Sequence, residues 1–181
     1  IGEADKYYQY INDFVSYIHH RVFSNQDSAI WQNIAWYFTQ NLNLINIYFN
    51  ESNLKDIYIK RADIMEFALK NRGSEIDYVF PARPANRNKI RLGIINSHFN
   101  PQTETYSTIP IFEYLDRNKF EVILYGVNLT NHPLEQYCQS RVDRLVKLPS
   151  DLQDQVQTIR ADDLDILLIG TNVTAVTNTV T

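Results

Sequence analysis

The chain has 181 residues, a formal net charge of −4 and 44% hydrophobic residues, as expected of an ordinary folded protein. Its single cysteine excludes a disulfide scaffold, and its acidic balance disfavours nucleic-acid binding. No apolar run reaches the ~18 residues of a membrane span, and one cysteine with four scattered histidines gives no zinc-binding spacing. We therefore expect a cytoplasmic protein without a metal, and with neither nucleic acid nor a membrane as partner.

Proline and aromatic residues are distributed unevenly along the chain. No proline precedes Pro81, whereas 16 of the 23 aromatic residues lie in residues 1–80. This predicts a helical segment over 1–80, a basic proline-containing linker over 81–89, and an α/β lobe over 90–181. The chain begins without methionine and stops shortly after an apolar stretch, so we expect a piece of a longer protein whose α/β lobe is truncated.

Three helices are predicted in the first part, over residues 5–23, 27–49 and 54–72. In each range apolar residues recur at three- and four-residue steps, which marks one apolar face of an amphipathic helix. Gly73 follows the third range, where a left-handed helix cap would be needed. The spacing between the starts of the predicted helices differs from the repeat length of about 34 residues in tetratricopeptide repeats. The pattern therefore favours a short helical bundle.

The linker and a later acidic turn carry opposite charges. The basic strip (Arg83, Arg87, Lys89 and Arg91) contains no acidic residue, and we favour a solvated linker over a cationic strip beside an anionic ligand. Asp162, Asp163 and Asp165 crowd the approach to the last apolar stretch. For these three we favour a solvated turn over a metal site.

The second part alternates strands and helices. Apolar stretches over 89–96, 120–127, 144–148 and 164–169 are separated by helical candidates over 104–115, 133–142 and 151–161. Near-continuous apolar strands separated by helices predict a parallel sheet covered on both faces, which is a Rossmann-like α/β half-domain. Gly93, inside the first strand, is expected to admit a closely packed helix. The loop after that strand reads NSHFNPQ, so it lacks the glycine fingerprint of dinucleotide binding.

Candidate binding residues follow the strand ends, because ligands of open parallel sheets bind at the carboxyl edge. Amide and hydroxyl side chains there suit the recognition of a sugar or a peptide. His98 is a weak candidate for a catalytic base, the alternative being a histidine that hydrogen-bonds the loop backbone. His132 is interpreted as a helix-start residue and Cys138 as buried and inert. The candidate ligand- or acceptor-binding residues are Asn96, Ser97, His98, Asn100, Thr103, Thr171 and Asn172.

Three segments resemble a known family. The run IRLGIINSHF and the later IPIFEYLDRNKFEVILYGV resemble the start of the catalytic region of the O-GlcNAc transferase / SPINDLY-like glycosyltransferase family, of bacterial type. The run IRADDLDILLIGTN resembles a further segment of that family, and the likeness covers about residues 89–175. The residues that match the family's second stretch are Asp116, Lys119, Phe120, Glu121, Val122 and Tyr125.

The resemblance implies a GT-B type fold of two Rossmann-like lobes with the active site between them. This chain would supply the first, acceptor-side lobe, and a missing second lobe would hold a UDP-GlcNAc-type donor, without a cofactor. The parent would be an inverting enzyme acting on Ser/Thr or Asn of a protein or peptide, and the piece alone would be inactive. His98 stands where relatives often show Asp, and the loop after Phe99 lacks the histidine that many members carry there.

A second hypothesis comes from another class of protein. The aromatic-rich helices are also compatible with a non-catalytic protein-interaction module, in which the α/β part would serve as scaffold.

Overall fold

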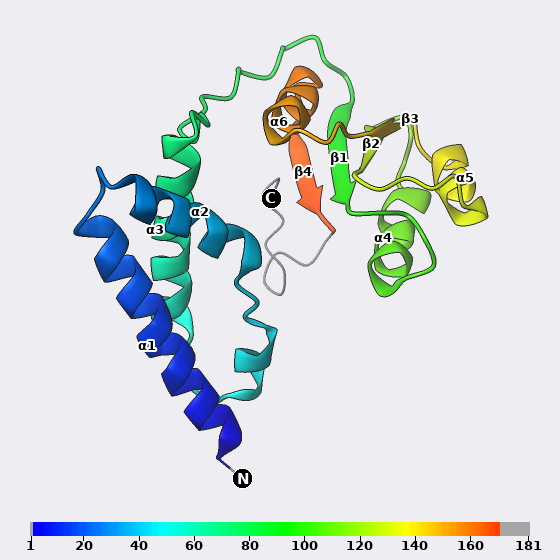
Figure 1. Cartoon of the computed structure of the whole chain (residues 1–181). Coiled ribbons are helices and arrows are strands. Elements are labelled where there is room, and N and C mark those ends of the chain that lie inside the picture. The colour runs from blue at the N-terminus through cyan, green and yellow to red at the C-terminus, as the bar shows by residue number, and fades with distance from the viewer. Residues whose placement is uncertain (1, 171–181) are drawn as a thin grey trace. The chain divides into compact units, whose positions relative to one another are not determined.

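The computed structural model describes residues 2–170, which fold into two compact units that divide between Val79 and Phe80. The first is a helical unit and the second an α/β unit (Figure 1). Each is described by itself. None of the helices within residues 2–170 combines the length and the hydropathy needed to cross a bilayer.

The helical unit packs three α-helices and a short 3-10 helix around one apolar core. Its elements are α1 (Glu3–Phe23), α2 (Ala29–Asn41), the 3-10 helix η1 (Ile45–Phe49) and α3 (Lys55–Asn71). The three- and four-residue spacing of apolar residues puts one stripe of each α-helix into the core. The buried core residues are Ile11, Val15, Ile18, Val22, Ala35, Phe38, Leu44, Ile47, Ile57, Ile64 and Ala68.

The prediction of a single second helix over 27–49 is wrong. Helix α2 ends at Asn41, and Leu42 already has an extended backbone with ψ 114°. The Asn43 side chain then accepts a hydrogen bond from the Ile45 backbone amide at 2.9 Å. Asparagine side chains that bond nearby backbone in this way compete with helix continuation, which explains why η1 starts as a separate element.

The predicted cap at the end of α3 is confirmed. Gly73 has φ 79°, in the left-handed region that glycine adopts without steric cost. Its amide donates to the Lys70 carbonyl at 3.0 Å, and the Ser74 amide donates back to the Leu69 carbonyl at 3.0 Å. These two bonds satisfy the last carbonyls of the helix.

The α/β unit is a parallel four-stranded sheet with the strand order β3-β2-β1-β4. Strands β1 (Ile90–Asn96) and β2 (Phe120–Gly126) occupy its centre, and β3 (Arg144–Lys147) and β4 (Ile166–Ile169) lie at its edges. The chain runs outward from β1 through β2 to β3 and then returns to the other side of β1. The carboxyl ends of β1 and β4 therefore form a topological switch point, where ligands bind in open α/β sheets.

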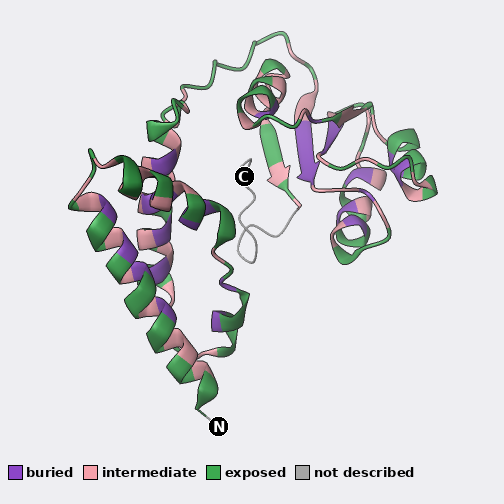
Figure 2. Cartoon of the chain, in the orientation of Figure 1, coloured by how far each residue is buried: buried purple, intermediate pink, exposed green. Residues whose placement is uncertain are grey.

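Helices cover both faces of the central strands, as predicted. Helices α4 (Thr103–Glu113) and α5 (Pro133–Ser140) pack on one face through a cluster that includes Phe112 and Cys138. On the other face, Ile159 of α6 (Leu152–Ala161) packs against Tyr125 and its neighbours. Figure 2 shows β1 and β2 largely in the colour of buried residues.

The expected burial of the last strand on both faces is wrong. In β4, Ile166, Leu167 and Ile169 are 48%, 42% and 42% exposed, because this edge strand has β1 on one side only.

The expected helix beside Gly93 is also not the neighbour that the structure shows. A Cβ atom on Gly93 would lie 2.4 Å from a methyl carbon of Leu164. The glycine therefore makes room for the side chains of Leu164, just before β4, and Leu167, within it, and not for a helix.

Candidate functional site

The two loops that leave the central strands are joined at the carboxyl edge of the sheet. Asn96 and Gly126, the last residues of β1 and β2, stand opposite each other in the parallel register. Beyond them the Asn128 amide donates to the Ser97 carbonyl at 2.7 Å. The Thr130 hydroxyl donates to Asn100 Oδ1 at 3.1 Å. These bonds make one surface of the loops over 97–102 and 127–132, which we call the carboxyl-edge site.

Asn96, a predicted binding residue, is completely buried. Its Nδ2 donates to Thr108 Oγ1 of α4 at 3.2 Å, while its buried Oδ1 has no hydrogen-bond partner among the described residues. A Cβ atom on Gly170 would lie only 2.0 Å from this oxygen. Asn96 therefore packs between α4 and the residue after β4, beneath the surface of the site.

The His98 side chain is half-buried above the end of β1. Its carbonyl accepts a hydrogen bond from Thr105 Oγ1 at 3.4 Å, while its ring Nδ1 is buried without a partner among residues 2–170. The ring makes no hydrogen bond to the described loop backbone, which the alternative interpretation required. Ser97 is half-buried beside it and contributes its carbonyl to the loop junction.

Asn100 and Thr103 lie where the first loop enters α4. The Asn100 carbonyl accepts from the Gln102 amide at 2.7 Å, and Thr103, the first residue of the helix, is exposed. Gln102 is the N-cap residue and makes no side-chain capping bond. The first amides of α4 thus lack a side-chain cap. A helix N-terminus carries a partial positive charge, so free amides there stabilise a negatively charged group nearby. The other two predicted residues, Thr171 and Asn172, lie outside the described residues.

The second loop depends on Glu135, which the sequence interpretation missed. This residue is 3% exposed, and its carboxylate accepts from the Thr130 amide at 3.0 Å and from the His132 amide at 3.1 Å. In return, His132 Nδ1 accepts from the Leu134 amide at 3.1 Å. This is a capping box, so the interpretation of His132 as a helix-start residue is confirmed. The glutamate three residues after the cap was the available signal.

A cavity of about 270 Å³ opens at the ends of β2 and β3. Amide side chains dominate its polar lining, and Lys147, the last residue of β3, adds one positive charge. Such a lining can hydrogen-bond hydroxyl and amide groups. The lining residues are Leu129, Asn131, Glu135, Gln136, Gln139, Leu145 and Lys147.

The basic strip lies instead at the amino edge of the sheet, where it is neutralised by the acidic turn. Arg87 is only 11% exposed and binds the carboxylates of Asp163 and Asp165. Arg83 lies 3.4 Å from Asp165, and the Arg91 amide donates to the same carboxylate at 2.8 Å. Residues 81–86 of the linker are exposed, as the solvated-linker interpretation expects. Arg87 and Arg91, in contrast, are held by carboxylates of the protein itself, and the aspartates of the acidic turn are half-buried in such contacts and not fully solvated.

Burial alone would raise the pKa of Asp165, but the Arg91 amide and the charges of Arg83 and Arg87 outweigh that effect. The net pKa of Asp165 lies below its ordinary value. Within residues 2–170 no group of three or more His, Cys, Asp or Glu side chains could hold a metal ion.

Cys138 is fully buried on α5, as predicted. Burial raises the pKa of its thiol to about 11, so the thiolate form is scarce at neutral pH.

The chain matches no protein-family model and no curated protein. Its structure is similar to that of a mutant O-GlcNAc transferase from Thermobaculum terrenum, with a TM-score of 0.53 and 17% sequence identity. The match covers 87% of this chain and 29% of that one, so the chain spans less than a third of its neighbour's length. At this identity the likeness establishes the fold alone: a Rossmann-like half-domain like that of an O-GlcNAc transferase, preceded by helices.

Proposed function

We propose that the chain supplies the acceptor-side lobe, with its helical preface, of a cytoplasmic bacterial protein glycosyltransferase. The donor is of the UDP-GlcNAc type, and the acceptor is Ser/Thr or Asn of a protein or peptide. The observation that carries the proposal is the polar carboxyl-edge site, formed by the loops after β1 and β2 of an O-GlcNAc-transferase-like fold. The division at residues 80–90 separates the helical preface from that lobe.

The chemistry of the edge supports an acceptor role. His98, Asn100 and Thr103 offer an imidazole, an amide and a hydroxyl along one loop. The cavity beside Lys147 adds further amide groups, which can hold the backbone of an extended peptide. His98 is the candidate base, because its half-buried ring stands in the first loop of the carboxyl-edge site; its Nδ1 is buried, so Nε2 would take the proton.

The same edge offers a nucleotide diphosphate little beyond the uncapped N-terminus of α4. Sugar transfer with inversion needs stabilisation of the leaving diphosphate, which basic side chains or helix N-termini provide. Among the described residues of the edge cavity, Lys147 supplies the one lysine or arginine, and Arg83, Arg87 and Arg91 are paired at the opposite edge. Donor binding is therefore assigned to a second lobe.

Turnover of UDP-GlcNAc by the 181-residue chain tests this assignment. The chain is incubated with UDP-GlcNAc and a Ser/Thr peptide, and released UDP is measured against a control without protein. We expect no release above the control and no heat of UDP binding by calorimetry. UDP release that depends on the chain would contradict the assignment of the donor to a second lobe.

The interaction-module alternative is supported by a second cavity. An apolar cleft of about 210 Å³ lies between α1 and α2, and its members Phe14 and Tyr37 are 38% and 70% exposed. If a peptide bound to this cleft and no peptide bound to the carboxyl-edge site, the interaction module would be favoured over the enzyme lobe.

A further inference from the structure

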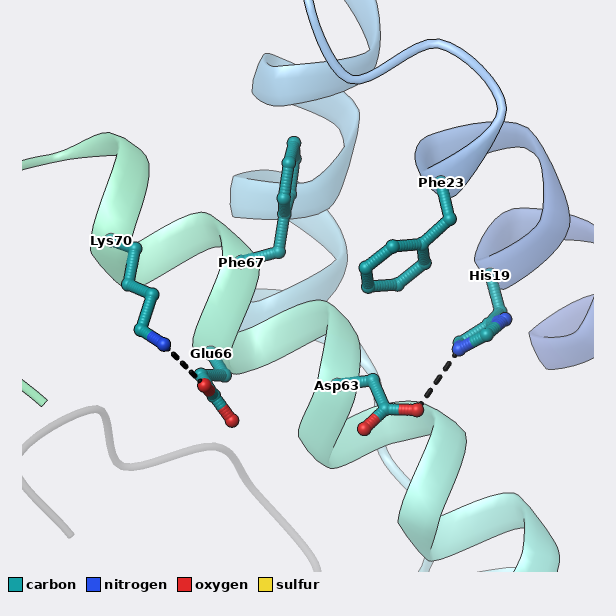
Figure 3. A pocket seen from close by; sticks show the side chains of 6 residues that line it. All are labelled: His19, Phe23, Asp63, Glu66, Phe67 and Lys70. Carbon is teal, nitrogen blue, oxygen red and sulfur yellow. Dashed lines mark hydrogen bonds and ion pairs between the residues drawn. The ribbon is translucent and has the colours of Figure 1, made fainter. Parts of the chain in front are cut away.

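A third cavity lies on the helical unit, between α1 and α3, and neither function uses it. Its volume is about 410 Å³, within the range of small-ligand pockets, ~300–1,000 Å³. We call it the α1–α3 cleft (Figure 3). Its lining residues are His19 and Phe23 from α1 and Asp63, Glu66, Phe67 and Lys70 from α3.

The wall of the cleft is aromatic. The Phe23 and Phe67 rings lie with their centroids 5.6 Å apart, and the His19 ring lies 4.6 Å from that of Phe23. Aromatic faces attract cations, and guanidinium groups stack on them readily. The same unit already places the Arg72 guanidinium 4.2 Å from the Trp36 ring centroid.

The opening of the cleft carries two carboxylates. Asp63 and Glu66 are three residues apart on α3 and lie on one face of the helix, as Figure 3 shows. Asp63 Oδ2 is bonded to His19 Nε2 at 3.0 Å, and Glu66 Oε1 accepts from Lys70 Nζ at 2.6 Å. The second oxygen of each carboxylate makes no hydrogen bond to another described residue. Two carboxylates that line the same cleft as aromatic rings favour a cation over an anion.

The lysine now paired with Glu66 can be displaced. The Lys70 and Glu66 side chains are 48% and 50% exposed, and exposed pairs of this kind contribute little to stability. The hydrogen bond that Lys70 donates to Glu66 raises the pKa of the lysine, so Lys70 stays charged and competes with an incoming cation. Asp77, 3.6 Å from Lys70, offers that lysine another partner.

We infer that the α1–α3 cleft binds an arginine side chain of a partner protein segment. The planar guanidinium lies against Phe23 and Phe67 and donates hydrogen bonds to Asp63 and Glu66. A lysine ammonium has no planar face to place on the rings and fits this arrangement less well. The inference does not depend on sugar transfer, since it rests on the helical unit alone.

The test uses fluorescein-labelled Gly/Ser peptides with one central arginine, read by fluorescence anisotropy on the full chain. Matched peptides carry lysine, or citrulline, which has the shape of arginine without its charge. We expect the arginine peptide to bind about tenfold more tightly than either. Equal binding of the citrulline peptide, or of the lysine peptide, would overturn the inference.

Variants locate the binding. Asp63→Asn with Glu66→Gln should weaken binding of the arginine peptide about tenfold, whereas Glu51→Gln, at an exposed carboxylate outside the cleft, should not. Lys70→Gln removes the competing cation and should strengthen binding by about two- to fivefold, a gain that a misfolded variant cannot show. Unchanged affinity in both cleft variants would contradict the assignment.

Discussion

Asn96 Nδ2 donates a hydrogen bond to Thr108 Oγ1 across 3.2 Å, at a position where Asn96 has no exposed surface. The bond fixes the end of β1 to α4, and the loop between them carries His98 and Asn100. Thr108 Oγ1 also donates toward the Glu104 carbonyl at 2.9 Å. A buried polar junction therefore holds the base of the carboxyl-edge site.

Removing this junction should destabilise the α/β unit. Asn96→Ala loses the bond and leaves a cavity beside Gly170, so we expect a loss of ~1–3 kcal/mol in the free energy of unfolding. Trp31 and Trp36 both lie in the helical unit, so tryptophan fluorescence does not report on this sheet. Hydrogen exchange of the β1 and β2 amides is the measurement. Exposed Thr103→Ala is the control, and equal protection in both variants would contradict the expectation.

Breaking the cluster between the basic strip and the acidic turn should also destabilise the α/β unit. Arg87→Met leaves the carboxylates of Asp163 and Asp165 without their most buried partner, and we expect a loss of ~2–3 kcal/mol. The loss in the free energy of unfolding is measured by hydrogen exchange of the sheet amides at increasing urea concentration. Lys119→Met removes a pair whose lysine is 75% exposed and should change stability by less than ~0.5 kcal/mol. Similar losses in the two variants would show that burial of the cluster is unimportant.

Asp165 should make stability depend on pH. Its pKa is lower in the folded protein than in the unfolded chain, so the unfolded chain takes up the proton first. The stabilisation is complete above the ordinary value of about 3.9 and is lost as pH falls through the lower folded-state pKa. The free energy of unfolding of wild type relative to Asp165→Asn should shrink across that window. A pH-independent difference for Asp165→Asn would contradict the expectation.

Cys138 should report on unfolding of the α/β unit. Its thiol is buried with a pKa of about 11, so iodoacetamide should react very slowly at pH near 8 in the native protein. In urea the rate should rise to that of a free thiol. Mass spectrometry of the alkylated chain measures both rates. Rapid alkylation without denaturant would show that α5 opens locally.

The sequence predicted the elements of the fold better than the surroundings of single residues. The apolar steps of α1 and the parallel strands were predictable, because each depends on local periodicity. The end of α2 was not, since a side-chain bond from Asn43 to the backbone ended the helix. Burial of Asn96 depends on Gly170, 74 residues further along the chain, and no local pattern carries that information.

The charged residues illustrate the same difference. Arg87 and Asp163 each look like solvated loop residues in the sequence, yet they bind each other across 76 positions of the chain. Glu135 could have been found, because it follows His132 by three residues in a capping-box pattern. The cavity beside Lys147 arises where separate strands end together, so its lining could be recognised only in three dimensions.

The proposed acceptor-side role is tested most directly by NMR mapping of peptide binding on the isotope-labelled chain. A Ser/Thr-containing peptide is titrated in, with a matched alanine peptide as control. The proposal predicts amide shifts at His98, Asn100, Thr103 and Thr130 that are larger for the Ser/Thr peptide. Shifts confined to α1 and α2, around Phe14, or the absence of any difference between the peptides at the carboxyl edge, would contradict it.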